Sequence, residues 1–226
     1  MARIYVALTC LVISISALAA QVEGISNTEA SSGLKQALAD GSAAAVGMLG
    51  KQDGFLANPK VKIPLPPVLQ KIESALRYTG MKRQADELVV GMNRAAEAAV
   101  PEAKALLIDS VKKMTLTDAK GILTGGDTAA TDYFRRTTRA QLTTRFRPIV
   151  KRVTDQVGLA QQYNGIAGQA AQLGLIREQQ STIDGYVTEK ALDGLYLMIA
   201  EQEKAFRQNP MGAASDIVKR VFGAVK

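Results

Sequence analysis

Apolar side chains recur every three or four positions along most of the chain, and this period predicts an all-α protein. One apolar stripe falls within residues 81–99 and contains Met81, Ala85, Leu88, Val89, Met92, Ala96 and Ala99. A second, within residues 186–207, is broad enough to predict a central, well-buried helix, and contains Val187, Ala191, Leu192, Leu195, Met198 and Ile199. We expect a single domain of about eight to ten helices over residues 20–226, with no internal repeat.

Capping and breaking residues set the expected limits of the first helices. Ser26 and Glu29 have the spacing of a capping box, and the helix that they begin is expected to run to Leu49 and stop at Gly50. Further helices are expected at about 67–80 and 159–173. Within 81–113, Pro101 either kinks one helix or begins a second.

The middle of the chain carries a second set of boundary signals. A short helix that starts near Thr117 is predicted to end at the pair Gly125–Gly126. Asp127 is then expected to cap the following helix, because a carboxylate accepts hydrogen bonds from the free amides of a first turn. That helix should run toward Gly158, and Pro148 is a candidate break within it.

Residues 51–67 interrupt the helical pattern. The prolines at 59, 64, 66 and 67 forbid a regular helix, while Val61, Ile63 and Leu65 alternate with other residues. We interpret this segment as an extended proline-rich strap whose aliphatic side chains lie on the helical core. The regular spacing of three large aliphatic residues favours this interpretation over a flexible linker.

The first 19 residues have the pattern of a signal peptide. Arg3 gives a positive start, residues 4–20 carry no charge, and Ala17-Leu18-Ala19 fits the site that signal peptidase cleaves. The alternative, an uncleaved anchor, needs about 20 strongly apolar residues, and Thr9, Ser14 and Ser16 dilute this run. We therefore predict export to the periplasm of a Gram-negative type of cell, with cleavage after Ala19.

Charge and residue content narrow the possible partners. Removal of residues 1–19 leaves 27 basic and 21 acidic side chains, so the exported chain is basic. A basic exported protein is expected to meet an anionic small molecule, a lipid head group at a membrane surface, or an acidic envelope partner. Nucleic acid would also suit the charge, but export argues against it, and we predict no nucleic-acid partner.

Several common chemistries are excluded by absent residue types. The chain has no histidine, and its single cysteine, Cys10, lies in the apolar run without the neighbours that a lipoprotein cysteine needs. Serine–histidine and cysteine–histidine catalysis are therefore closed to it, as are ordinary zinc sites. No phosphate-binding loop and no calcium loop occurs. We expect no cofactor, no metal and no enzymatic role, with a hydrolase that uses two carboxylates as the weakest alternative.

Segment 133–154 concentrates positive charge. It has no acidic residue and seven basic ones, namely Arg135, Arg136, Arg139, Arg145, Arg147, Lys151 and Arg152. A core stripe is expected at Leu142, Phe146, Ile149, Val150, Val153 and Val157. Projected back at 100° per residue, that stripe includes Arg135 and Arg139, whereas Arg136, Arg147 and Lys151 point away from it.

Three interpretations of Arg135 and Arg139 stay open. In the first, the helix breaks near Thr137-Thr138 and both arginines reach solvent. In the second, both form ion pairs with acids such as Glu97, Asp184 or Glu189. In the third, both line a cleft that binds an anionic ligand. A second polar group, Asn93, Arg94 and Glu97, shares one side of its helix. Its default interpretation is an i,i+3 ion pair at the surface, and the alternative is a cluster that meets Arg135. The candidate ligand-binding residues are Arg135, Arg136, Arg139, Asn93, Arg94 and Glu97.

Five phrases of the sequence resemble a known family. They are Asp53-Gly54-Phe55, residues 58–66 (Asn-Pro at 58–59 and Lys-Ile-Pro-Leu-Pro at 62–66), residues 93–97, residues 133–138, and residues 189–195. In order and spacing they resemble the bacterial family called domain of unknown function 4197, over roughly residues 26–223. The resemblance implies an exported, helical, uncharacterised protein, and it supplies no activity and no catalytic residue. Some members look like lipoproteins, and this chain differs from them at Cys10.

Two non-enzymatic hypotheses follow. The first is a periplasmic binding or envelope-interaction protein that uses the arginine-rich segment 133–154. The second is a membrane-surface protein that docks by its basic carboxy-terminal segment, where Lys219, Arg220 and Lys226 flank Ile217, Val221 and Phe222. Packing of that last segment on the core is the competing interpretation.

Overall fold

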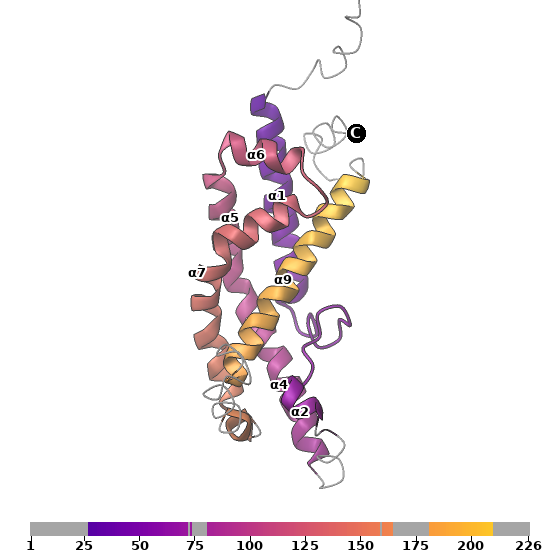
Figure 1. Cartoon of the computed structure of the whole chain (residues 1–226), viewed down its shortest axis with the longest axis vertical. Helices are drawn as coiled ribbons and strands as arrows, with labels where there is room; N and C mark the ends of the chain where they lie inside the picture. The colour runs from indigo at the N-terminus through magenta and orange to yellow at the C-terminus, as the bar shows by residue number, and fades with distance from the viewer. Residues whose placement is uncertain (1–26, 72, 74–80, 159, 165–180, 210–226) are drawn as a thin grey trace, which may run out of the picture.

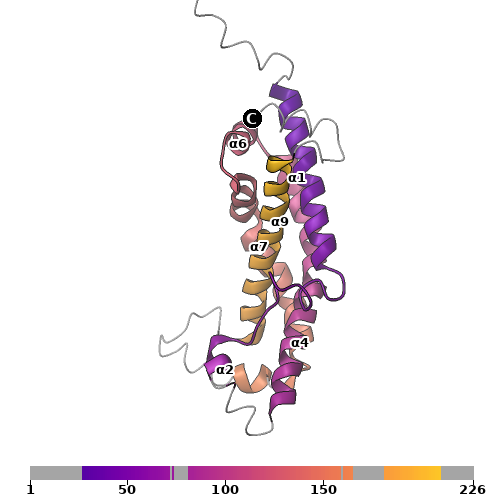
Figure 2. The ribbon, with the colours of Figure 1, turned by 90° about the vertical axis from the view of Figure 1, so that its right-hand side faces the viewer.

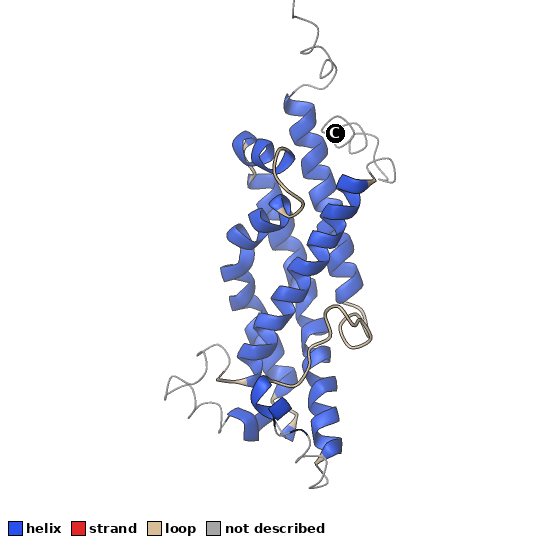
Figure 3. Ribbon diagram, turned by 45° about the vertical axis from the view of Figure 1, so that its right-hand side comes forward, coloured by secondary structure: helices blue, strands red, loops and turns tan. Residues whose placement is uncertain are grey.

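All regular secondary structure in the described part of the chain is helical (Figure 3). The computed structural model describes residues 27–71, 73, 81–158, 160–164 and 181–209. Its elements are α1 (Asn27–Leu49), α2 (Pro67–Lys71), α4 (Lys82–Ala99), the 3-10 turn η1 (Val100–Glu102), α5 (Ala103–Lys113), α6 (Leu116–Leu123), α7 (Ala129–Thr154) and α9 (Ile183–Gln208). The all-α prediction is confirmed.

The long helices α7 and α9 pack against each other along their lengths in opposite directions (Figure 1). The start of α7 meets the end of α9 where Ala130 contacts Glu203, and the last third of α7 meets the start of α9 where Arg147 contacts Asp184. Helix α1 covers one end of this pair together with α5 and α6, and α4 covers the other end (Figure 2). The bundle is therefore elongated. Helix α9 contacts α1, α4 and α7, as the broad apolar stripe of α9 predicts.

One continuous core runs through the bundle. Its largest fully buried side chains include Phe55, Phe134, Phe146, Tyr186 and Tyr196. Burial of a side chain of this size stabilises the fold by roughly 1.5–3 kcal/mol relative to exposure. Four of these five lie on α7 and α9, which places the main stabilising contacts in that helix pair.

A short 3-10 turn that contains Pro101 separates α4 from α5. Helix α4 ends at Ala99, the 3-10 turn takes in Val100–Glu102, and α5 starts at Ala103. A proline has no amide hydrogen to donate inside an α-helix. Pro101 lies in the first turn of the 3-10 helix, where its amide would have no partner within the turn. Pro101 therefore separates two helices, the second of the two outcomes that the sequence allowed.

Residues 51–66 form the connection between α1 and α2 without helix. Its first half is a series of turns, with Asp53 at a positive φ of 66°, so this half is not extended as the strap prediction held. Gly54 packs on the carbonyls of Met48 and Leu49, where an added Cβ would lie 2.4 Å from the Leu49 oxygen. Only glycine fits such an approach. In the second half Val61, Ile63 and Leu65 are buried.

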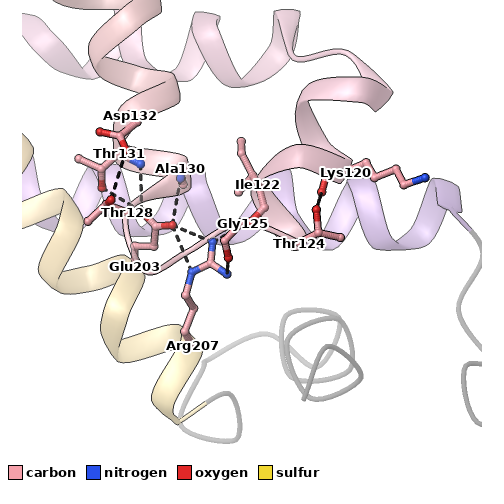
Figure 4. A network of polar contacts seen from close by, with 10 residues as sticks. All are labelled: Lys120, Ile122, Thr124, Gly125, Thr128, Ala130, Thr131, Asp132, Glu203 and Arg207. Carbon is pink, nitrogen blue, oxygen red and sulfur yellow. Dashed lines mark hydrogen bonds and ion pairs between the residues drawn. The ribbon is translucent and has the colours of Figure 1, made fainter.

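The first turn of α7 is capped by a side chain from α9 rather than by Asp127. The Glu203 carboxylate accepts hydrogen bonds from the amides of Ala130 and Thr131, each at 2.9 Å (Figure 4). Arg207 donates to the same carboxylate at 2.8 Å and to the Ile122 carbonyl at the end of α6. The prediction of an Asp127 cap is wrong, because Asp127 is exposed and a buried carboxylate already occupies the helix terminus.

Helix α7 continues through both places where a break was considered. Pro148 lies inside α7 and is exposed. The carbonyl that its missing amide leaves free belongs to Thr144, which is also on the exposed face. Thr137 and Thr138 are helical as well, and their hydroxyl groups donate to backbone carbonyls one turn earlier. The interpretation that relied on a break at Thr137-Thr138 is therefore wrong.

Some predicted elements fall outside the described residues. Ser26 of the expected capping box is one, and so are most of the helix predicted at 159–173 and the whole carboxy-terminal segment from residue 210. The total number of helices in the chain stays a prediction.

Candidate anion-binding surface on α7

The buried face of α7 winds around the helix. Every fourth residue is buried, in the series Ala130, Phe134, Thr138, Leu142, Phe146, Val150 and Thr154. Four residues turn an ideal helix by about 400°, so the buried row advances by about 40° at each step. A straight stripe drawn back from Phe146 and Val150 therefore misses Phe134 and points to Arg135 and Arg139 instead. These two arginines lie beside the core and not on it.

The flank of α7 that faces α9 uses its arginines in contacts within the protein. Arg139 pairs with Asp193 at 3.0 Å, and Arg147 pairs with Asp184 at 2.9 Å. The Arg135 guanidinium lies over the Tyr196 ring, 5.3 Å from its centre. The second interpretation is thus partly right. Ion pairs do form, and Asp184 is used, but by Arg147, while Arg139 pairs with an acid that was not foreseen.

These contacts join α7 to α9 along the surface edge of their interface. The side chains of Arg139 and Arg147 are 34% and 61% exposed. Exposed ion pairs contribute only about 0–1 kcal/mol each, so they align the two helices more than they stabilise them. Beneath them, the Thr138 hydroxyl lies 2.9 Å from the Tyr196 hydroxyl in a buried hydrogen bond, and burial raises the pKa of Tyr196.

The outward face of α7 keeps cations without a carboxylate partner. Arg145 and Arg152 are exposed, and neither forms an ion pair or hydrogen bond in the described part of the protein. They lie seven residues apart, or two helical turns, on one face. Lys151 differs, since its hydrogen bonds to Asp155 raise its pKa. Across α7, seven basic side chains stand against one acidic residue, Asp132.

The opposite flank of α7 borders a cleft. A cavity of about 290 Å³ lies between α5, α6 and α7, and Arg136 is at its rim. Arg136 is 68% exposed, lies over the Tyr133 ring, and is 3.6 Å from Asp118, which is longer than a hydrogen bond. Of the candidate arginines, Arg136 is therefore the one that borders this cavity, although the sequence placed it away from the core.

Hydroxyl groups form the floor of this cleft and satisfy one another. The Tyr133 hydroxyl donates to the Ser110 carbonyl at 2.8 Å. The Thr137 hydroxyl donates to the Tyr133 carbonyl, so the Ser110 hydroxyl is the donor in its 2.7 Å contact with Thr137. Ser110, Tyr133 and Thr138 are all buried. The floor is consequently rigid and polar.

Asn93, Arg94 and Glu97 bind the connection 51–66 to α4. Asn93 is fully buried and pairs with both backbone groups of Ile63, accepting from the amide at 2.8 Å and donating to the carbonyl at 2.9 Å. Glu97 accepts from the amides of Phe55 and Leu56 at 3.0 and 3.1 Å. The polar atoms of these two side chains are thus used inside the protein.

Arg94 completes this cluster. It donates to Glu97 at 2.6 Å and to Asp53 at 2.7 Å. The predicted i,i+3 pair therefore forms, although Glu97 is buried and not at the surface. The hydrogen bond to Glu97, and then that to Asp53, raise the pKa of Arg94. The alternative that this cluster meets Arg135 is wrong, because Arg135 contacts Tyr196 on another helix.

Sequence reasoning missed Asp193, Tyr196, Asp118 and Glu203. Asp118 had a local signal, since Thr115 and Asp118 have capping-box spacing and do form that box. The partners on α9 had none, because their pairing depends on how α7 and α9 are aligned. The described helices include none long and apolar enough to cross a membrane.

The described residues form an all-α bundle with one strongly basic helix. They include no cluster of three or more side chains that could hold a metal ion. A family model called protein of unknown function (DUF4197) matches residues 24–223. The chain belongs to this family, as the resemblance of its five phrases predicted. No curated protein and no solved structure matches it.

Proposed function

We propose that this protein is a non-enzymatic binding protein of the cell envelope that engages an anionic partner through the basic outer face of α7. The observation that carries the proposal is the exposure of Arg145 and Arg152 without carboxylate partners in the described part of the chain. Cations left free in this way remain available to external phosphate or carboxylate groups.

The geometry of this face favours an extended partner. Arg145 and Arg152 are seven residues apart on one face of the helix, a separation of about 10 Å. The face is a convex helix surface, which suits the phosphate groups of a lipid surface better than an enclosed small molecule. Export through residues 1–19 is part of the proposal and would bring the protein to such a surface.

Two carboxylates border the cleft beside Arg136, but they do not favour a hydrolase. Asp109 pairs with Lys113 at 2.7 Å, and Asp118 accepts from the hydroxyl and amide of Thr115. These bonds, those to the Thr115 hydroxyl first, lower the pKa of Asp118. A general acid of a glycosidase needs a raised pKa, so Asp118 is poorly suited to that role.

Binding to lipid vesicles tests the proposal. Vesicles that contain phosphatidylglycerol should retain the purified protein in a sedimentation assay, whereas phosphatidylcholine vesicles should not. Because exposed charges are screened within about 8 Å at physiological salt, retention should weaken as sodium chloride is raised. Equal retention by both kinds of vesicle, or retention that salt does not change, would contradict the proposal.

A further inference from the structure

The cleft between α5, α6 and α7 has hydrogen-bond donors that the protein does not use. The side-chain amide of Gln141 borders the cleft and has no partner among the described residues. Among the described residues Arg136 forms no hydrogen bond, and its ion pair with Asp118 is long, at 3.6 Å. Both side chains line the cleft from α7, five residues apart.

Each carboxylate beside the cleft has one partner within the protein. Asp118 is held by Thr115, and Asp109 is held by Lys113. The carbonyl of Ser110 accepts from the Tyr133 hydroxyl. A ligand with a carboxylate or phosphate group therefore competes for the Arg136 guanidinium only with Asp118 Oδ1, which lies 3.6 Å away and forms no hydrogen bond with it.

We propose that this cleft binds a small anion that presents a carboxylate or phosphate group to Arg136. The planar guanidinium offers two parallel N–H groups to such a group, Gln141 adds a third donor, and Lys113 at the rim adds positive charge. Lys113 is 76% exposed, so breaking its ion pair with Asp109 to contact a ligand costs little free energy. The volume of about 290 Å³ equals that of roughly ten water molecules at about 30 Å³ each, which suits a small organic acid or a phosphate ester.

This inference names a second anion site, in a cleft that is open to solvent, and it does not depend on the outer face of α7. It rests on Arg136 and Gln141, whereas the proposed function rests on Arg145 and Arg152. The stacking of Arg136 on Tyr133, at 5.6 Å from the ring centre, holds the guanidinium over the cleft before any ligand arrives. Such preorganisation lowers the entropic cost of binding.

Titration of succinate and of inorganic phosphate into the ¹⁵N-labelled protein, at constant ionic strength, tests the inference. Saturable shifts are expected for the backbone amide signals of residues 109–113 and 136–141, and the arm that saturates at lower concentration tells which anion the cleft prefers. The Arg136→Gln variant should weaken binding at least ten-fold, and Gln141→Ala should weaken it less. Arg136→Lys should be intermediate, because it keeps the charge and loses the fork.

Arg83→Gln is the matched control, since it removes the same charge from an exposed position on α4 that does not line the cleft. It should bind the anion like the parent, and the spectra themselves report whether each variant is folded. Two outcomes would overturn the inference. One is no saturable shift from either anion up to about 20 mM, well above a Kd of about 1 mM, and the other is equal affinity in the parent and Arg136→Gln. Neither outcome would count against the proposed function, which the vesicle assay tests separately.

Discussion

Replacement of Glu203 by alanine is predicted to be among the most damaging single changes to this fold. The carboxylate is 3% exposed and accepts hydrogen bonds from Ala130, Thr131 and Arg207 at 2.8–2.9 Å (Figure 4). Glu203→Ala leaves two amides at the start of α7 without an acceptor and leaves Arg207, which is 13% exposed, without its partner. Loss of one member of a buried ion pair costs about 3–5 kcal/mol.

That cost is a large fraction of the 5–15 kcal/mol by which domains of this kind are typically stable. Equilibrium unfolding in urea, followed by circular dichroism at 222 nm, measures it. Asp127→Ala is the matched control, because Asp127 is the residue that the sequence alone placed at this helix terminus. Its replacement should change the free energy of unfolding by less than about 0.5 kcal/mol.

A double change separates the two parts of the cost. Arg207→Met removes the cation that Glu203→Ala leaves unpaired, so the double variant should lose less than the sum of the two single variants. A cost below about 1 kcal/mol for Glu203→Ala, or an equal cost for Asp127→Ala, would refute the assignment of Glu203 as the cap of α7.

Three further predictions concern buried polar groups. The Thr188 hydroxyl is buried and has no hydrogen-bond partner among the described residues, so Thr188→Val should raise the free energy of unfolding by about 1 kcal/mol; Thr138→Val, which removes the bond to Tyr196, should lower it by a similar amount, and the opposite order in urea unfolding would contradict both. Asn93→Ala orphans two buried backbone groups of Ile63 and should cost about 2–5 kcal/mol, measured as a shift of the urea midpoint with unchanged slope. Burial, and then the nearby Tyr163 and Glu189, raise the pKa of Tyr186 to about 12. Because tyrosine in the unfolded chain has a pKa of about 10, the stability that Tyr186 contributes is complete below pH 10 and is lost between pH 10 and 12, by up to about 2.7 kcal/mol; Tyr186→Phe should flatten this loss in urea titrations at rising pH.

The period of apolar residues was sufficient to predict the fold class and the central place of α9, because local spacing reports which face of a helix is buried. Glycine and proline signals also predicted the end of α1 at Leu49, and they limited Pro101 to a kink or a new helix, of which the structure has the second. Such signals act within a few residues and need no knowledge of tertiary contacts.

The candidate site was less predictable. Arg135 and Arg139 were placed on the core because a fixed stripe does not follow a buried row that repeats every four residues. Their contacts with Tyr196 and Asp193 depend on the alignment of two helices about 55 residues apart in the chain. The role of Glu203 at the start of α7 is hidden for the same reason, and Asp127 was preferred only because it is local.

The most direct test of the account compares free and paired arginines of α7 in one binding assay. The variant Arg145→Gln/Arg152→Gln removes two exposed, unpaired charges, and Arg139→Gln/Arg147→Gln removes two charges that are paired with Asp193 and Asp184. Both lose the same net charge. We predict that the first variant loses at least ten-fold in affinity for phosphatidylglycerol vesicles while the second loses less than three-fold. Equal losses, or a greater loss in the second variant, would contradict the claim that the outer face of α7 binds the anionic partner.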